Sequence, residues 1–325
     1  MWLFRFLRFP NLLIVALTQY LLQNAILLPA FRPADLSPTL GGFPFFLFSL
    51  TTMLIAATGY VVNDIVDVEM DLLNKPEKVF VNRLISKKNA WRLYFGLTAF
   101  GFAIAFYLAV YVENLSLVLI FPAAVGMLAW YSFQLKKIPV AGNVTVAIFC
   151  AFVAGVVLFA ERKTFGELCL VNPAAAQEVQ VLFGGYLLFA FFSTMVREIV
   201  KDIEDLEGDR TSGCRTLPIA FGMNTAKIWA FSLAFALLLQ VVLFGKWLVE
   251  KEEWAGLAFL VAGIILPLVF LIFKLKTAQV KAEFARLSLF AKLIMAAGLV
   301  LLVVIWVAWY SFQLKKIPVA GNVTV

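Results

Sequence analysis

Long apolar segments alternate with short polar ones along most of the chain. A helix needs about 20 apolar residues to cross roughly 30 Å of hydrocarbon, because it rises only about 1.5 Å per residue. Segments of about this length lie near residues 11–31, 43–62, 91–110, 115–133, 141–160, 180–197, 226–247, 254–273 and 288–308. The pattern predicts an all-α polytopic membrane protein with nine transmembrane helices. Its first segment is too long for the core of a signal peptide.

One internal repeat departs from this pattern. Residues 129–146, AWYSFQLKKIPVAGNVTV, recur without any change at 308–325. Structural repeats in transporters diverge and have longer periods, whereas a short unchanged copy is typical of an assembly or recombination product. We therefore expect residues 1–307 to form a single transmembrane domain and residues 308–325 to have no function.

The composition agrees with a membrane protein and excludes several kinds of site. Apolar residues make up 63% of the chain and charged residues 14%, against roughly 45–50% and 25% in soluble domains. The chain has no histidine, and its three cysteines are dispersed. A histidine-based zinc site and a cysteine metal cluster are therefore excluded.

The basic residues predict the orientation of the chain. The formal net charge is +7, and 20 of the 27 Lys and Arg residues fall at the N-terminus and in the loops that follow even-numbered spans. By the positive-inside rule these segments are cytoplasmic. The charge therefore indicates orientation, and it does not indicate a nucleic-acid partner.

Two of the cytoplasmic loops contain acidic motifs with the same spacing. Each motif has three aspartates at positions i, i+3 and i+7. The first acidic motif is Asn63 with Asp64, Asp67 and Asp71, and the second acidic motif is Asp202, Asp205 and Asp209. On a continuous helix each trio would span only about 60° of one face, just beyond a predicted span.

Such rows of like charge predict a bound cation. Mg²⁺ prefers oxygen ligands and typically takes one or two carboxylates, completing its shell with waters and substrate phosphate oxygens. All seven motif residues are therefore candidate Mg²⁺ ligands, and we expect Asp64, Asp67, Asp202 and Asp205 to be the catalytic carboxylates. A single DxxD is more often a solvated charge run, but the duplicated spacing favours a diphosphate site.

Basic and polar residues near the motifs are candidates for substrate binding, because Arg and Lys bind phosphate oxygens. The candidates are Asn11, Lys78, Lys136, Lys201 and Arg215. The alternative for the basic residues is the positive-inside bias alone. Asn11 lies near the cytoplasmic edge of the first span, whereas Gln19, deeper in that span, is interpreted as a helix–helix contact.

Taken together, these motifs resemble those of the UbiA superfamily of intramembrane prenyltransferases. The first acidic motif is similar to NDxxDxxxD, and Asp205 and Asp209 are similar to the family's DxxxD, with Asp202 as an added carboxylate. Lys78 stands where the family often has the Arg of Pro-x-Arg-Pro. Other family-like segments are residues 8–11, 131–136, 142–143 and 215–222.

The resemblance implies nine helices around a central cavity open to lipid, in a bacterial or archaeal cell membrane. It also implies that Mg²⁺ holds a prenyl diphosphate whose prenyl group passes to a membrane-associated acceptor. Residues 197–209 are most similar to the digeranylgeranylglyceryl phosphate synthase-like subgroup. That subgroup implies geranylgeranyl diphosphate as donor, a prenylated glycerol phosphate as acceptor and an ether lipid as product.

Two other functions remain open from the sequence. The acceptor can instead be aromatic, as in quinone biosynthesis by other branches of the superfamily. A secondary transporter is the remoter alternative, because intramembrane carboxylates suit transporters as well. Transporter sites usually lie near the bilayer midplane, whereas here the carboxylates are predicted at the ends of the spans.

Overall fold

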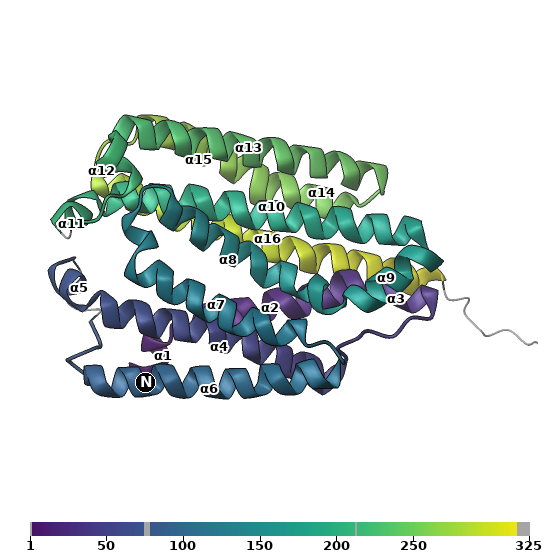
Figure 1. Ribbon diagram of the computed structural model, residues 1–325. Coiled ribbons are helices and arrows are strands. Elements are labelled where there is room, and N and C mark those ends of the chain that lie inside the picture. Colours follow the sequence, from purple (N-terminus) through teal and green to yellow (C-terminus); the bar gives the residue numbers. More distant parts are fainter. Residues whose placement is uncertain (1, 75–78, 212, 317–325) are drawn as a thin grey trace, which may run out of the picture.

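The computed structural model describes residues 2–74, 79–211 and 213–316. Within these ranges the chain forms helices and no strand, apart from one isolated bridge between Val81 and Ile85. Nine helical segments there are long and apolar enough to cross a membrane. The predicted all-α membrane fold is therefore confirmed for the described residues, which form one elongated bundle (Figure 1).

Most spans consist of a single helix. The first span combines α2 (Phe9–Leu22), the π-helical turn η1 (Gln23–Leu27) and α3 (Leu28–Phe31), and the eighth combines α14 (Trp254–Leu260), the π-helical turn η5 (Val261–Ile265) and α15 (Leu266–Thr277). The others are α4 (Gly42–Val66), α6 (Lys87–Tyr111), α7 (Ser116–Phe133), α8 (Ala141–Ala160), α10 (Pro173–Glu204), α13 (Met223–Glu250) and the long helix α16 (Lys281–Lys316).

Short helices occupy the two ends of the bundle. One end, at the left in Figure 1, has α5 (Val68–Asn74), α11 (Leu206–Thr211) and α12 (Leu217–Phe221). The opposite end has α3 and α9 (Arg162–Val171), while α1 (Trp2–Phe6) precedes the first span. Both acidic motifs lie at the end of α5 and α11.

Helix α10 is the centre of the bundle, with its most extensive contacts to α8, α13 and α16. Alanines repeat every fourth residue along α13, and Ala226, Ala230 and Ala234 are all fully buried. Small residues at this spacing let two helices approach closely where lipid gives no hydrophobic driving force for association.

Helix α10 is longer than the sixth predicted span, residues 180–197. It has 32 residues and begins with Pro173 after the N-cap Asn172.

The exterior and interior of the bundle follow the rules for a protein in lipid. Large apolar side chains such as Phe95, Phe106 and Phe235 are more than half exposed, because hydrocarbon solvates them as well as a protein core does. Inside, Gln19 is fully buried and donates to Thr52 Oγ1 at 3.0 Å and to the Val153 carbonyl at 3.3 Å. This residue joins three spans, as the sequence predicts.

The repeated segment adopts two backbone conformations. In the first copy α7 ends at Phe133, a 3-10 turn (η4, Leu135–Lys137) follows, and α8 begins at Ala141. In the second copy the corresponding residues up to Lys316 simply extend α16. The expectation that residues 308–325 have no function stays a prediction.

Candidate active site

Each acidic motif sits where a long helix gives way to a short one. Asp67 lies between α4 and α5 with φ −89° and ψ 3°, and Asp205 lies between α10 and α11 with φ −90° and ψ 8°. The prediction of a continuous helical face is therefore wrong, because the middle aspartate interrupts the helix in both motifs. Asp64 and Asp202 lie in the last turns of α4 and α10 rather than beyond the spans.

Backbone hydrogen bonds of helical spacing lie on both sides of each interruption. The amide of Asp67 donates to the Asn63 carbonyl at 2.9 Å, and the amide of Asp71 donates to the Asp67 carbonyl at 2.8 Å. The second motif repeats this arrangement, with the Asp209 amide donating to the Asp205 carbonyl at 3.0 Å. In each motif the middle aspartate therefore ends one helix and precedes the next.

An arginine and a tyrosine surround the first carboxylate of the first motif. Arg8 donates from Nη2 to Asp64 Oδ1 at 2.7 Å, and its guanidinium stacks over the Tyr60 ring at 4.7 Å. The side chain of Asn11 lies near the Tyr60 hydroxyl. Asn11 therefore lies beside the first motif as predicted, whereas sequence reasoning assigned no role to Arg8.

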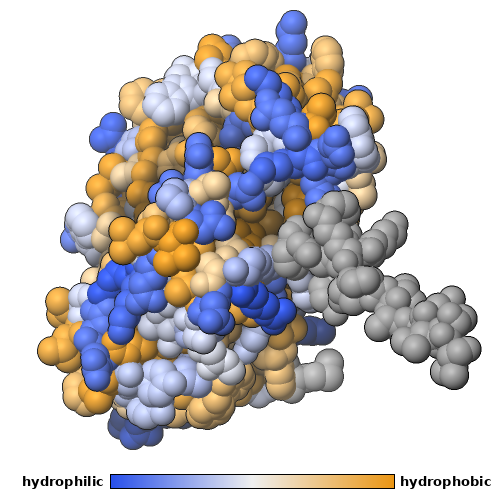
Figure 2. Space-filling model, turned by 90° about the vertical axis from the view of Figure 1, so that its right-hand side faces the viewer, coloured by the Kyte–Doolittle hydropathy of each residue, from blue (hydrophilic) through white to orange (hydrophobic). Residues whose placement is uncertain are grey.

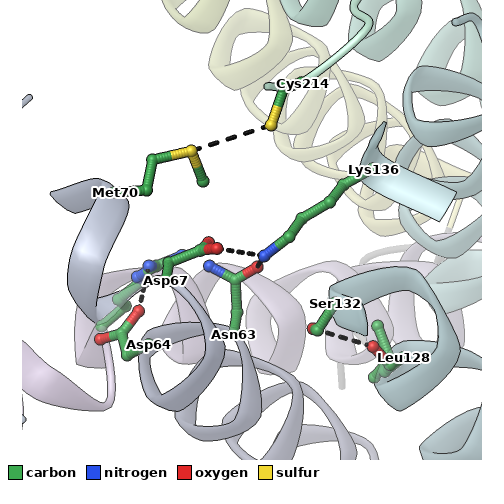
Figure 3. Close-up of polar contacts among 9 residues, drawn as sticks. Asn63, Asp64, Asp67, Met70, Leu128, Ser132, Lys136 and Cys214 are labelled. Atoms are coloured by element: carbon green, nitrogen blue, oxygen red, sulfur yellow. Dashed lines mark hydrogen bonds and ion pairs between the residues drawn. The ribbon is translucent and has the colours of Figure 1, made fainter. Parts of the chain in front are cut away.

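Lys136 reaches the first motif from the turn between α7 and α8. Its ammonium forms an ion pair with Asp67 and lies 3.5 Å from Asn63 Oδ1 (Figure 3). Both side chains of the pair are only 9% exposed. The oxygens of two motif residues therefore converge on one positive centre, and Lys136 lies at the predicted site.

A neutral amide holds the first carboxylate of the second motif. Asn143, near the start of α8, donates from Nδ2 to Asp202 Oδ2 at 2.8 Å. A cavity of about 40 Å³ is lined by Lys136, Asn143 and Asp202 together with Tyr131 and Glu198. Lys136 thus links the first motif to a cavity shared with the second.

The turn that carries Lys136 and Asn143 has an unusual backbone. Val140 has a φ of 67°, which is strained for a β-branched residue and costs on the order of 1–3 kcal/mol. A Cβ at Gly142 would lie 3.0 Å from the Cα of Lys136, so only glycine permits this approach without a shift. The amide of Arg215 donates to the Lys137 carbonyl at 3.2 Å and ties the turn to the segment after the second motif.

A sulfur contact joins the first motif to the segment that follows the second. Cys214 Sγ lies 3.8 Å from Met70 Sδ (Figure 3). Burial and the nearby charge of Asp209 raise the pKa of the Cys214 thiol, so the thiol stays protonated near neutral pH. The two motifs therefore face one another across the end of the bundle.

The remaining predicted binding residues are less closely engaged. Lys201 is half-buried on α10 next to Asp202, and the side chain of Arg215 is exposed. Lys78 lies outside the described residues. Sequence reasoning also missed Tyr131, Asn143 and Glu198; the first two fall in family-like segments, which is the signal that could have selected them.

The donor set at this end fits Mg²⁺. Among the residues that the structure describes, no three carboxylates or thiols lie close enough together to form a complete metal cage. Mg²⁺ needs no such cage, because it usually takes one or two carboxylates and obtains its other oxygens from water and substrate phosphate. The carboxylate and amide oxygens that meet at the ammonium of Lys136 are hard donors of the right kind.

Comparison with known proteins shows the family of the chain. The model of the UbiA prenyltransferase family matches residues 26–294. The chain belongs to this family. It is 34% identical over 199 residues to a digeranylgeranylglyceryl phosphate synthase of Saccharolobus solfataricus, covering 60% of this chain and 62% of that one. The chain thus matches less than two thirds of the length of this relative.

Solved structures confirm the fold. A structure described as digeranylgeranylglyceryl phosphate synthase has a TM-score of 0.62 and 21% identity, covering 93% of this chain and 97% of the other. A UbiA homolog from Archaeoglobus fulgidus bound to DMAPP and Mg²⁺ has a TM-score of 0.53 and 18% identity, covering 93% and 99%. These likenesses concern the helical architecture alone.

Proposed function

We propose that the protein is a Mg²⁺-dependent prenyltransferase that uses the end of the bundle where the two acidic motifs face each other. The observation that carries the proposal is the position of Lys136, which pairs with Asp67 and lines the cavity that also holds Asp202. A transporter is disfavoured, because both carboxylate groups lie at one end of the spans instead of at mid-depth.

Mg²⁺ would be held by the oxygens of the two motifs, chiefly by Asp64 and Asp67 on one side and by Asp202 and Asp205 on the other. The metal supplies positive charge that neutralises a diphosphate leaving group. A UbiA homolog that binds DMAPP with Mg²⁺ supports this assignment. Asn63, Asp71 and Asp209 complete the proposed ligand set.

The chain's own cations also act on the diphosphate. The ammonium of Lys136 lines the cavity of about 40 Å³ beside Asp202, so in this proposal it contacts a diphosphate bound between the two motifs. Arg8 and Lys136 then bind phosphate oxygens, with Asn11, Lys78, Lys201 and Arg215 as further candidates. Donors placed in advance stabilise the charge that develops as the leaving group departs.

The transfer itself exchanges one carbon–oxygen bond for another. The bond between C1 of the prenyl group and the diphosphate oxygen breaks, and the diphosphate leaves with the electron pair. The acceptor's hydroxyl oxygen forms the new bond to C1 and loses its proton. Glu198, which lines the shared cavity, is a carboxylate that can take this proton.

The proposed donor is geranylgeranyl diphosphate, and the proposed acceptor is a prenylated glycerol phosphate, so that the product is an ether lipid. Similarity to digeranylgeranylglyceryl phosphate synthases supports this choice. An aromatic acceptor is the second candidate, because other branches of the family prenylate aromatic rings. The lipid substrates are supplied by the surrounding membrane.

We further propose that the N-terminus and both acidic motifs are cytoplasmic, on the strength of the positive-inside rule. The protein then faces the soluble pool of magnesium and releases diphosphate into the cytoplasm of a bacterial or archaeal cell. Residues 1–307 constitute the functional domain in this proposal. A chain that ends at residue 307 is therefore expected to insert and to turn over like the full chain.

The experiment that tests the function uses the full chain reconstituted in lipid nanodiscs with radiolabelled geranylgeranyl diphosphate. The acceptors are a prenylated glycerol phosphate, the same lipid without its phosphate, 4-hydroxybenzoate and a dihydroxynaphthoate. We expect transfer to the glycerol phosphate to dominate and to stop when EDTA removes the metal. Preferred transfer to an aromatic acceptor would overturn the subgroup, and full activity in EDTA would overturn the metal requirement.

A further inference from the structure

A second and larger cavity lies at the end of the bundle opposite the acidic motifs. Its volume is about 550 Å³, which is within the range of small-molecule binding sites. Its walls come from three connections, with Thr39 before α4, Glu113 and Asn114 between α6 and α7, and Arg162 and Lys163 at the start of α9. Figure 2 shows this end, where hydrophilic patches lie among apolar ones.

Two cations at the cavity are suited to a phosphate group. Arg162 is held in place because its Nη2 donates to Ser116 Oγ at 3.1 Å and its guanidinium stacks over the Phe159 ring at 4.5 Å. A guanidinium has five N–H donors, so further donors remain for a ligand. Lys163 is exposed and forms no ion pair with any carboxylate in the described part of the chain.

One carboxylate stands at the same cavity. Glu113 has a left-handed backbone with φ 53° in the tight connection between α6 and α7. The neighbouring Asn114 is fixed there, since its Oδ1 accepts from Ser116 Oγ at 2.6 Å. Two cations and one carboxylate complement a ligand that carries both a phosphate and an ammonium group.

The position of the cavity indicates that this ligand is a lipid. The cavity lies where the spans α6 and α8 end, at the level of the membrane boundary. Helix α9 follows directly and leaves apolar side chains exposed, with Leu170 at 85% and Val171 at 64%. Apolar residues on a short helix just beyond a span are typical of a helix lying at the headgroup level.

We propose that this cavity binds the headgroup of a zwitterionic phospholipid, with the phosphate at Arg162 and Lys163 and the ammonium at Glu113. This site is separate from the prenyl-transfer site and does not depend on that function. It places a bilayer lipid between the connection of α6 to α7 and the start of α9.

The test is lipid binding to the purified full chain, measured by native mass spectrometry during titration with a phosphatidylethanolamine, a phosphatidylglycerol or inorganic phosphate. We expect the ethanolamine lipid to bind best. Lys163→Ala should weaken that binding about tenfold, as expected for loss of one hydrogen bond to a charged group. The matched control is Lys246→Ala, an exposed lysine at the same end of the bundle but outside the cavity, which should bind as wild type.

A second variant tests the ammonium contact independently of Lys163. Glu113→Gln should remove the preference for the ethanolamine lipid over the glycerol lipid, without lowering prenyl transfer. Equal binding by wild type and Lys163→Ala would overturn the proposal, as would an unchanged headgroup preference in Glu113→Gln. If inorganic phosphate fully displaces the ethanolamine lipid at the same concentration, the cavity is a site for free phosphate and the lipid proposal is overturned.

Discussion

The two acidic motifs share their spacing and their bend, yet their carboxylates have different partners. In the first motif Asp64 and Asp67 are neutralised by the cations Arg8 and Lys136. In the second motif Asp202 accepts from the neutral amide of Asn143, a contact that brings no positive charge. Under the proposed function, the first motif exchanges its own cations for metal and diphosphate, whereas Asp202 has no cation to exchange in this contact.

The largest expected effect comes from removing one carboxylate of each motif. Asp67→Ala and Asp202→Ala should each lower turnover by at least about 100-fold, because each removes charge stabilisation at the reacting group. Their stabilities should differ. Asp67→Ala leaves the buried ammonium of Lys136 unpaired, at a cost of roughly 3–5 kcal/mol, whereas Asp202→Ala leaves only an amide without its acceptor. Turnover and thermal unfolding are measured on the same preparations.

Glu204→Ala is the matched control for that comparison. Glu204 is the last residue of α10 and adjoins the bend at Asp205, but it falls outside the shared spacing of the two motifs. Its turnover should equal that of wild type. If Glu204→Ala lowers turnover as much as Asp202→Ala does, then turnover depends on the total negative charge near the second motif and not on the spacing of its aspartates.

Substitution of Lys136 tests whether the cation of the first motif acts on substrate. Lys136→Met should lower kcat/KM for the prenyl diphosphate by about 10- to 100-fold, because a charge-assisted hydrogen bond to a phosphate oxygen is lost. Lys136→Arg keeps the charge and should retain part of the activity. If Lys136→Met instead binds the diphosphate as tightly as wild type, the ammonium serves only the ion pair with Asp67.

A smaller effect is expected at the second motif's amide. Asn143→Ala removes one hydrogen bond to Asp202 and should lower turnover by no more than about tenfold. Asn143→Asp places a second carboxylate against Asp202 and should lower turnover further at low Mg²⁺, with recovery as Mg²⁺ is raised. Titration of activity against Mg²⁺ separates the two variants. An identical Mg²⁺ profile in both would contradict the idea that the amide preserves a metal-binding charge.

The smallest effect concerns a carboxyl group far from both motifs. Glu161, after α8, is fully buried and accepts from the amides of Thr39 at 2.7 Å and Leu40 at 2.9 Å. Burial raises its pKa, so the folded chain binds its proton more tightly than the unfolded chain does. The group's contribution to stability is therefore full below the unfolded pKa and is lost as the pH rises through the folded pKa.

The measurement is the thermal midpoint of wild type and Glu161→Gln across the range from about pH 5 to about pH 8. The midpoint of wild type should fall more steeply with rising pH than that of the variant. Prenyl transfer at a temperature where both are folded should not differ between them. If the thermal midpoints of wild type and Glu161→Gln change with pH in parallel, the pKa of Glu161 is the same in the folded and the unfolded chain.

Sequence patterns predicted the parts of this molecule that depend on composition and spacing. The spans follow from apolar length, and the placement of both motifs at one end of the bundle follows from the order of the spans. Lys136 was predicted as a substrate-binding candidate on the side of the motifs, since the loop between the fourth and fifth spans is on the same side, and that role stays a prediction. The side chain of Asn11 also reaches the first motif, through Tyr60.

Other features depend on distant contacts that no local pattern encodes. The spacing of the aspartates suits a straight helix, and the bends at Asp67 and Asp205 appear only in the backbone angles. Arg8 pairs with a residue 56 positions away, so its partner could not be read from its neighbours. Val140 would ordinarily avoid a positive φ, and here the packing of the turn imposes one.

The repeated nonapeptide AWYSFQLKK shows that the end of α7 is not encoded locally. At residues 129–137 this sequence leaves the α-helix after Phe133 and ends in the 3-10 turn η4, whereas at residues 308–316 it stays α-helical. Short-range preferences are identical in the two places, so the difference must come from what surrounds them. At the first copy, the amide of Arg215, which lies outside the repeat, donates to the Lys137 carbonyl. The turn that carries Lys136 is therefore held in part by a contact from the second half of the chain.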